Sequence, residues 1–356
     1  MSGMVVTATL SIEHFRHAEG PLVDVRSPGE FEQGHWPGAI NLPLFTDQER
    51  AEVGTTYKQM GRSKAIEIGL KTTGPKLAEL AEALKAIVDD HSGSGLRLYC
   101  WRGGMRSGSL AWLAELLDLQ PRVLEGGYKS YRRWVLEQFQ LQWPLRLLAG
   151  RTGTGKTELL KTLSAMDVAV VDLEGLAHHR GSSFGGLGMP PQPRTEHFEN
   201  LLAEDLDRCR SIQAQQIWLE AESARIGNCQ IPSALVLQMK SSPALEIRRS
   251  LQERVERLVE VYGLQGRQEL QEATMRISRR LGPQRTRQAM EALEINRWDL
   301  ACEAMLDYYD RCYEHELARN SERTSIDLTG FDNDEAASIL LKTGQIQACQ
   351  PILSGC

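Results

Sequence analysis

Residues 98–108 read LYCWRGGMRSG and place a cysteine at the end of an apolar run, directly before a loop of glycine and arginine. Such a loop can direct backbone N–H groups at the Cys100 sulfur, and a following helix adds the positive end of its dipole. Both effects favour thiolate over thiol, and Arg102 and Arg106 add positive charge nearby. The pattern indicates a nucleophile that accepts a group from an anionic donor, whereas a buried structural cysteine would have apolar neighbours. The expected anion-binding loop comprises Trp101, Arg102, Gly103, Gly104, Met105 and Arg106.

A second anion-binding pattern occupies residues 150–157, where GRTGTGKT matches G-x-x-x-x-G-K-[ST] between an apolar run and a helical pattern. Glycines let the backbone curl so that successive N–H groups point at one anion, and the helix N-terminus adds to this. Lys156 would supply a point charge and Thr157 a ligand for Mg²⁺. ATP, GTP and an organic diphosphate all present the same oxygens to such a loop. The predicted phosphate-binding residues are Gly150, Gly153, Gly155, Lys156 and Thr157.

Acidic and basic side chains follow the next apolar runs. Glu220 ends the run IWLE, the position at which a carboxylate orients Mg²⁺ and its water in phosphate-loop enzymes, although an ordinary acidic strand end is an equal alternative. Asp172 in VVDLEG competes for that role. Arg180 is expected to contact an anion from a flexible loop. The adjacent His178 and His179 point apart on a strand or helix, so no shared metal and no structural metal site is expected.

A cluster of arginines interrupts an otherwise acidic chain. The formal net charge is −6, yet residues 240–290 hold eleven basic and six acidic side chains. The stretch RISRRLGPQRTR contains no acidic residue, which favours contact with RNA phosphates. For the preceding stretch EIRRSLQERVERLVEVYG, a solvated helix face with Glu–Arg pairs is a strong alternative. The candidate nucleic-acid contacts are Arg276, Arg279, Arg280, Arg285 and Arg287.

Strands that alternate with helices must position these groups, which predicts parallel α/β sheets. The first sheet is expected over residues 8–138, with a helix opened by Ser27 and Pro28 and another over 74–90. A phosphate-binding core over 145–240 follows, with strands at 168–175, 217–223 and 234–240. From Pro243 the pattern is helical and Arg-rich, so residues 241–356 are predicted to be a helical extension.

Length and composition limit the number of domains and the broad class of protein that this chain can form. A chain of 356 residues favours two domains, and 41% hydrophobic with 25% charged residues is ordinary for a soluble globular protein. No apolar stretch approaches a membrane span, and no signal peptide precedes the first domain, so a cytoplasmic protein is expected. The seven cysteines include no C-x-x-C pair, which argues against a disulfide framework or zinc site. Nothing specifies the oligomeric state, and a monomer is the expectation.

The segments LVDVRSPGEFEQGHWPGAINLPL, YCWRGGMRSGS and LEGGYKSYRRWV resemble a rhodanese domain over residues 8–138. The resemblance implies that Cys100 carries the transferred group and that Asp24 and Arg26 are mainly structural. Common sulfurtransferase loops place the arginine five residues after the cysteine, whereas Arg106 lies six after Cys100. This longer loop resembles those of rhodanese-like phosphatases and arsenate reductases, and it implies room for a group larger than one sulfur atom.

The order of CWRGGMRSGS and GRTGTGKT makes the whole chain resemble the tRNA 2-selenouridine synthase family, as do DLEGLAHHRGSSFGG and LEAESARIG. The resemblance implies a transferase that converts 2-thiouridine at the wobble position of tRNA to 2-selenouridine with selenophosphate, and it makes tRNA the expected partner of the five candidate arginines. It implies an S-geranyl-2-thiouridine intermediate made from geranyl diphosphate, and an S-selanylcysteine at Cys100. No permanent cofactor is implied; the co-substrates are selenophosphate and geranyl diphosphate, and Mg²⁺ would assist.

Three other functions fit parts of the pattern. One is a rhodanese-type sulfurtransferase, and another is a phosphatase or arsenate-reductase-like enzyme; in both, the phosphate-loop domain would be a regulatory NTPase. The third is a nucleotide-gated binding protein in which Cys100 is only a redox sensor. Neither of the last two explains a basic C-terminal half together with two anion loops.

Overall fold

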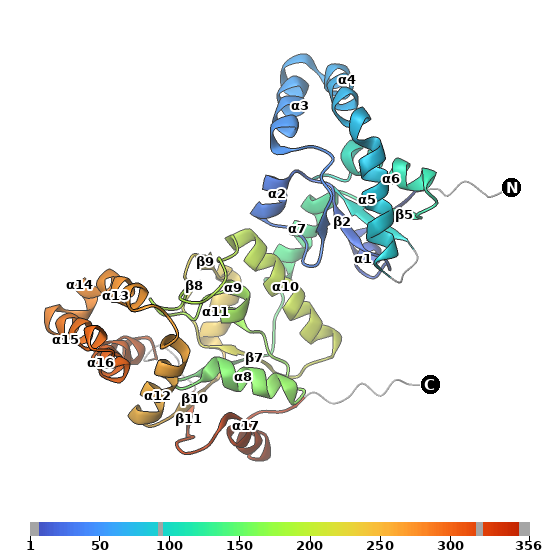
Figure 1. The fold of residues 1–356 in the computed structure, drawn as a ribbon. Helices are drawn as coiled ribbons and strands as arrows, with labels where there is room; N and C mark the ends of the chain where they lie inside the picture. Colours follow the sequence, from blue (N-terminus) through green and yellow to red (C-terminus); the bar gives the residue numbers. More distant parts are fainter. Residues whose placement is uncertain (1–6, 92–94, 318–322, 349–356) are drawn as a thin grey trace. The chain divides into compact units, whose positions relative to one another are not determined.

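The computed structural model describes residues 7–91, 95–317 and 323–348. The chain divides into two compact units, Met1–Glu137 and Gln138–Cys356, here called the N-terminal and C-terminal units (Figure 1). Each unit contains a parallel sheet covered by helices, so the predicted α/β class with two parallel sheets is confirmed. Among the described residues, no helix is long and apolar enough to cross a membrane.

The N-terminal unit is built on a five-stranded sheet of order β1-β5-β4-β2-β3, in which every neighbouring pair is parallel. Its strands are β1 (Ala8–Leu10), β2 (Leu22–Asp24), β3 (Ile40–Asn41), β4 (Leu96–Tyr99) and β5 (Pro121–Leu124). The central strand β4 is buried from both faces, with Leu96 and Leu98 fully inaccessible. The residue that follows this central strand is Cys100, which therefore lies at the carboxyl edge of the sheet.

Helices cover both faces of this sheet. They are α1 (Ile12–Arg16), α2 (Pro28–Gln33), α3 (Asp47–Met60), α4 (Arg62–Thr73), the 3₁₀ turn η1 (Gly74–Lys76), α5 (Leu77–Asp89), α6 (Met105–Leu116) and α7 (Gly127–Gln138). Helix α2 begins as predicted, with Pro28 at its first position and a reciprocal capping box between Ser27 and Glu30. The sequence pattern does not predict α3 or α4, because α3 buries only Thr56 and so lacks an apolar periodicity.

The C-terminal unit contains a four-stranded parallel sheet of order β11-β10-β6-β7 and a small antiparallel pair, β8-β9. The strands are β6 (Leu145–Ala149), β7 (Ile217–Glu220), β8 (Arg225–Ile226), β9 (Cys229–Gln230), β10 (Ala244–Arg248) and β11 (Arg323–Asp327). The helices are α8 (Lys156–Ala165), α9 (Leu173–Ala177), α10 (Thr195–Ser211), α11 (Ser233–Ser241), α12 (Leu251–Tyr262), α13 (Arg267–Arg276), α14 (Ser278–Leu281), α15 (Pro283–Glu294), α16 (Trp298–Leu317) and α17 (Asn333–Lys342).

Two strand predictions in this unit are wrong. Residues 234–240 form helix α11, in which Leu235 and Met239 are buried on one face while Leu237 is exposed. A short apolar run does not distinguish a strand from a helix, and here the four-residue spacing decides. The strand is instead β10, and with β11 it lies in the region expected to be wholly helical. Residues 168–175 make only an isolated bridge from Val170 to Trp218 before α9 begins.

The Arg-rich segment does form a helical subcluster beside the sheet. Helices α13, α14, α15 and α16 bury an apolar core of their own, whose members include Leu270, Ile277, Leu281, Leu293 and Met305. Helix α12 connects this subcluster to β10. Because α12 follows the strand next to β6, its side chains can reach the loop that follows β6.

Candidate active site: a cysteine loop and a phosphate loop

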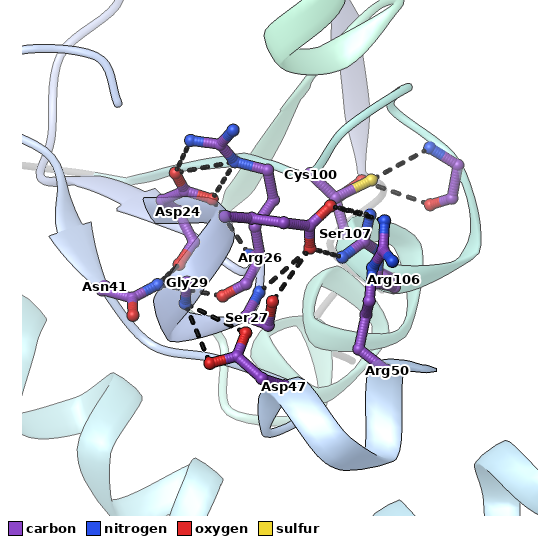
Figure 2. A network of polar contacts seen from close by, with 12 residues as sticks. Asp24, Arg26, Ser27, Gly29, Asn41, Asp47, Arg50, Cys100, Arg106 and Ser107 are labelled. Atoms are coloured by element: carbon purple, nitrogen blue, oxygen red, sulfur yellow. Dashed lines mark hydrogen bonds and ion pairs between the residues drawn. The ribbon is translucent and has the colours of Figure 1, made fainter. Parts of the chain in front are cut away.

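Cys100 lies between the end of β4 and the N-terminus of α6, as predicted, and its residue surface is only 3% exposed. The Gly104 N–H donates to Sγ at 3.4 Å, and the Ser107 hydroxyl donates to Sγ at 3.2 Å (Figure 2). Sequence analysis missed Ser107, although it lies within the quoted segment. The end of the loop and the first turn of α6 therefore direct hydrogen-bond donors at the sulfur.

These donors change the acidity of the thiol. Burial raises the pKa of Cys100, but the Ser107 hydroxyl and the backbone N–H groups of Ser107, Arg102 and Gly104 more than offset burial. The net pKa lies below that of an ordinary cysteine thiol. A lowered thiol pKa is the property that a cysteine nucleophile requires, so the role predicted for Cys100 stays consistent with its surroundings.

Arg106 reaches the cysteine loop from the first turn of α6 and is held by a carboxylate. Its Nη1 donates to Glu30 Oε2 at 2.6 Å and its Nη2 to Glu30 Oε1 at 3.4 Å, and Arg50 lies 3.5 Å from the same carboxylate. Burial raises the pKa of Glu30, but Arg106 and the other donors hold it below its usual range. Glu30 is thus an anionic partner that fixes the guanidinium beside Cys100, and sequence analysis missed it.

The turn before α7 supports the cysteine loop from behind. Tyr128 N–H donates to Cys100 O at 2.7 Å, and Lys129 N–H donates to Trp101 O at 3.1 Å. Gly127 has φ +59°, and a Cβ there would lie 2.3 Å from both Cys100 O and Gly103 N. Only glycine permits this approach, which explains the Gly-Gly pair in LEGGYKSYRRW.

Asp24 and Arg26 form a buried pair beneath the site. Arg26 Nη2 donates to Asp24 Oδ2 at 2.6 Å and to Gly34 O at 2.7 Å, and its guanidinium lies 3.7 Å from the Tyr128 ring centroid. Both side chains are inaccessible to solvent. Their contacts are internal, which agrees with the structural role that the rhodanese resemblance implies.

The phosphate loop joins β6 to α8 as predicted. Gly153 and Gly155 have φ values of +83° and +79°, which lets the backbone curl ahead of the helix. Lys156 Nζ donates to Gly150 O at 2.9 Å and so lies across the loop. The geometry is that of an anion cradle closed by a lysine.

Three arginines from the segment around α12 brace this loop, and none was predicted for that role. Arg249 Nε donates to Thr154 O at 3.2 Å, and Arg254 Nε donates to Thr152 O at 2.9 Å. A Cβ on Gly155 would lie 2.5 Å from Nη1 of Arg257, so that guanidinium packs on the loop itself. Arg249 and Arg254 thus hold two carbonyl groups of the loop, while within the loop the Thr154 N–H donates to Arg151 O at 3.1 Å.

Acidic side chains gather on the other side of the loop. Glu220 is fully buried; its Oε2 accepts from Leu173 N–H at 3.1 Å, and its Oε1 has no hydrogen-bond partner. Glu174, which sequence analysis missed, accepts from the Thr157 hydroxyl at 2.5 Å. Asp172 Oδ1 accepts from Gly175 N–H at 2.7 Å and caps α9. Burial raises the pKa of both glutamates, and their neighbouring carboxylates raise that of Glu220 further.

A polar cleft of about 390 Å³ opens over the phosphate loop. Lys156, Arg180, Arg257 and Arg280 line it, so the predicted anion contact Arg180 and one of the candidate tRNA arginines face the same space. The cleft adjoins a pocket of about 50 Å³ inside the helical subcluster. Both spaces are lined by Thr152, Ser182, Leu258, Tyr262 and Tyr309.

The remaining candidate arginines lie on α13, α14 and α15. Arg276, Arg279 and Arg287 are exposed. Arg285 is half-buried, and its Nη2 lies 2.5 Å from Asp307 Oδ2. Their role in binding tRNA stays a prediction, with Arg285 the weakest candidate because its charge is already paired.

Known proteins match both units. The model of the tRNA 2-selenouridine synthase AAA domain matches residues 143–341, and that of the rhodanese-like domain matches residues 11–133. A tRNA 2-selenouridine synthase of Marinobacter nauticus is 38% identical over 84% of this chain and 89% of its own length. Those of Hahella chejuensis and Bordetella bronchiseptica are 38% and 36% identical over 85% and 92% of this chain, and over 87% and 95% of their own lengths. The chain therefore belongs to the tRNA 2-selenouridine synthase family.

Proposed function

We propose that this protein is a tRNA-modifying transferase that converts wobble 2-thiouridine to 2-selenouridine. In this proposal geranyl diphosphate first alkylates the sulfur, and selenium from selenophosphate then displaces the S-geranyl group. Family membership and the names of the relatives support the overall conversion. The two anion sites, one in each unit, suit the two anionic co-substrates.

One observation favours geranyl diphosphate over a nucleotide at the phosphate loop: the anion cleft continues into an apolar pocket. Beyond the shared mouth, the walls include Phe184, Leu270, Leu293, Trp298 and Met305. The hydroxyl of Thr274, a polar residue in this wall, is already donated to Leu270 O at 2.8 Å. A hydrocarbon chain would gain free energy from burial against these mostly apolar walls.

The first step needs a stabilised leaving group. The thiouridine sulfur attacks C1 of the geranyl chain, the C1–O bond breaks, and its electron pair leaves with diphosphate. Lys156 and Arg257 line the cleft over the phosphate loop and would stabilise that developing charge. Fixed donors of this kind stabilise a transition state without reorganising.

The residues beside Thr157 fit a magnesium ion. Mg²⁺ beside a diphosphate prefers oxygen ligands. This region offers the buried carboxylates of Glu174 and Glu220, whose pKa values are raised, and the Thr157 hydroxyl. Oε1 of Glu220 has no hydrogen-bond partner. Thr157, Glu174 and Glu220 are the residues that would hold it, directly or through water. When bound, the ion would neutralise charge on the departing diphosphate.

Alkylation prepares the second step. A sulfur doubly bonded to C2 of uracil is a poor leaving group, whereas an S-geranyl group leaves as a stable thiolate. Cys100, with its lowered pKa and adjacent arginines, is the residue proposed to process selenophosphate. The exposed arginines of α13, α14 and α15 would bind tRNA phosphates.

Mass spectrometry of RNA nucleosides tests this division of labour. Lys156→Ala is expected to abolish geranylation of 2-thiouridine RNA but to keep selenation of RNA that already carries S-geranyl-2-thiouridine. Cys100→Ser is expected to keep geranylation of 2-thiouridine RNA but to abolish selenation of RNA that carries S-geranyl-2-thiouridine. Lys161→Ala, on the exposed face of the same helix α8, is the matched control and should resemble the wild type. Undiminished geranylation by folded Lys156→Ala would reject the assignment of the phosphate loop.

A further inference from the structure

We propose that Cys100 attacks the phosphorus atom of selenophosphate, so that the covalent intermediate is an S-phosphocysteine and selenium leaves as hydrogen selenide. This inference rests on the proposed function, which makes selenophosphate the donor. It differs from the S-selanylcysteine that the family resemblance implies. The geometry of the cysteine loop and the electron balance of the reaction both favour attack at phosphorus over attack at selenium.

Electron balance separates the two possible attacks. Selenium in selenophosphate is already at the selenide level, bound to phosphorus(V). If the thiolate attacked selenium, the P–Se electron pair would stay on phosphorus and yield phosphite. Phosphate would form only with an added two-electron oxidant, and the proposed reaction contains none.

Attack at phosphorus needs no oxidant. The S–P bond forms as the P–Se bond breaks, and the electron pair leaves with selenium: Cys–S⁻ + HSe–PO₃²⁻ gives Cys–S–PO₃²⁻ + HSe⁻. The HSe⁻ ion then attacks C2 of S-geranyl-2-thiouridine and expels geranyl thiolate, while its proton passes to N3 of the base. Water hydrolyses the S–P bond and returns the Cys100 thiol and hydrogen phosphate.

The loop is built for a tetrahedral oxyanion above the sulfur. The Gly104 N–H donates to Sγ at 3.4 Å and the Ser107 hydroxyl at 3.2 Å, and α6 starts at Met105, directly after Gly104. Three phosphoryl oxygens would accept from such donors, whereas a single selenium atom bound to Sγ would leave them without oxygen partners. The position of Arg106, six residues after Cys100, gives the loop the extra length for this group.

Arg106 can hold the phosphoryl group without leaving Glu30. A guanidinium has five N–H donors, and Glu30 takes one from Nη1 and one from Nη2. The remaining donors are available to an anion. Glu30 is thus a positioning residue that fixes which edge of Arg106 faces the donor.

Two groups leave in this mechanism, HSe⁻ in the first step and the Cys100 thiolate in the hydrolysis step, and the residues around Sγ suit both departures. Hydrogen selenide is a stronger acid than a thiol, so HSe⁻ departs without a general acid. Glu30 is ion-paired with a lowered pKa and so holds no proton to give. In the hydrolysis step the thiolate itself must leave, and the Ser107 hydroxyl, 3.2 Å from Sγ, stabilises that charge.

The test is to identify the adduct on Cys100 after rapid mixing with selenophosphate and denaturing quench of the full-length protein. Peptide mass spectrometry distinguishes a phosphoryl group from selenium, because selenium has a characteristic isotope pattern. Ser107→Ala removes the hydroxyl that assists thiolate departure, so the phosphoryl adduct should accumulate as its hydrolysis slows by about 10²-fold. Ser109→Ala is the matched control, because its exposed hydroxyl donates only to Met105 O.

The outcomes are distinguishable. A phosphoryl group on Cys100, enriched in Ser107→Ala and absent in Cys100→Ser, supports the inference. A selenium adduct on Cys100 with phosphite in the phosphorus-31 spectrum overturns it, as does turnover with no Cys100 adduct in either protein. If the wild type consumes no selenophosphate, the proposed donor is wrong and the inference falls with it.

Discussion

Replacing Gly127 by alanine tests whether the turn after β5 sets the position of the Cys100 loop. The new Cβ would lie 2.3 Å from Cys100 O and 2.3 Å from Gly103 N. A carbon–oxygen contact is comfortable only at about 3.3 Å or more. Backbone on one side or the other must therefore move by about 1 Å.

The size of the effect follows from that displacement. A shift of about 1 Å in a reacting group can cost about 10²-fold in rate. The positive φ of Gly127, +59°, adds a strain of about 1–2 kcal/mol to the folded state. We therefore expect Gly127→Ala to lower the selenation rate by about 10²-fold and to lower the melting temperature by several degrees. Geranylation, which is assigned to the other unit, should be unchanged.

Gly126→Ala provides the matched control. Gly126 also has a positive φ, +71°, but its Cβ would approach only the Ser130 side chain, at 3.1 Å. The two variants share the backbone strain and differ in the contact with the nucleophile's loop. Selenation and geranylation are read from RNA nucleosides by mass spectrometry, and stability from thermal unfolding. Equal losses of selenation in the two variants, or full activity in Gly127→Ala, would refute the reasoning.

Three further outcomes are expected. Because the pKa of Cys100 is lowered, its alkylation by iodoacetamide should persist below the pH at which ordinary thiols protonate; Ser107→Ala should move the midpoint upward. The pocket of about 50 Å³ holds roughly three to five non-hydrogen atoms, or one isoprene unit. Ala301→Leu should therefore reduce kcat/KM for geranyl diphosphate by about 10- to 100-fold while sparing dimethylallyl diphosphate; equal losses would contradict this. In tRNA binding, Arg287→Ala should reduce the slope of log affinity against log salt concentration by about 1, and Arg285→Ala should reduce it by less. A slope for Arg287→Ala equal to that of the wild type would exclude Arg287 from the tRNA interface.

Contiguous motifs made much of the site predictable. Cys100 and Lys156 each lie in a strand–loop–helix segment whose composition predicts an anion-binding loop, and the structure places Cys100 directly after β4 and Lys156 at the first residue of α8. Sequence spacing does not indicate partners that arrive from elsewhere in the chain. Glu30 reaches Arg106 across 76 positions, and Arg254 reaches Thr152 across 102.

The same difference applies to the helices: those specified by neighbouring residues were predictable, and those that depend on contacts with distant residues were not. Helix α2 was predictable from its cap and proline, which act within one turn. Helix α11 was not, because its apolar run is short and its burial depends on β6, against which it packs. Glu174 was missed for a similar reason: it follows Asp172 by two residues, and only the formation of α9 turns it, rather than Asp172, toward Thr157.

The strand order of the C-terminal unit has a consequence for the protein during its own synthesis. Strand β6 carries the phosphate loop but lies between β7 and β10, and its loop is braced by Arg249 and Arg254. The ribosome makes these partners about a hundred residues after the loop. The sheet of the N-terminal unit is complete at Leu124. Since domains generally fold in the order in which they are synthesised, a nascent chain should complete the loop around Cys100 well before its phosphate loop is braced. The nascent chain would therefore contain the acidic thiol for an interval in which the phosphate loop still lacks its bracing arginines.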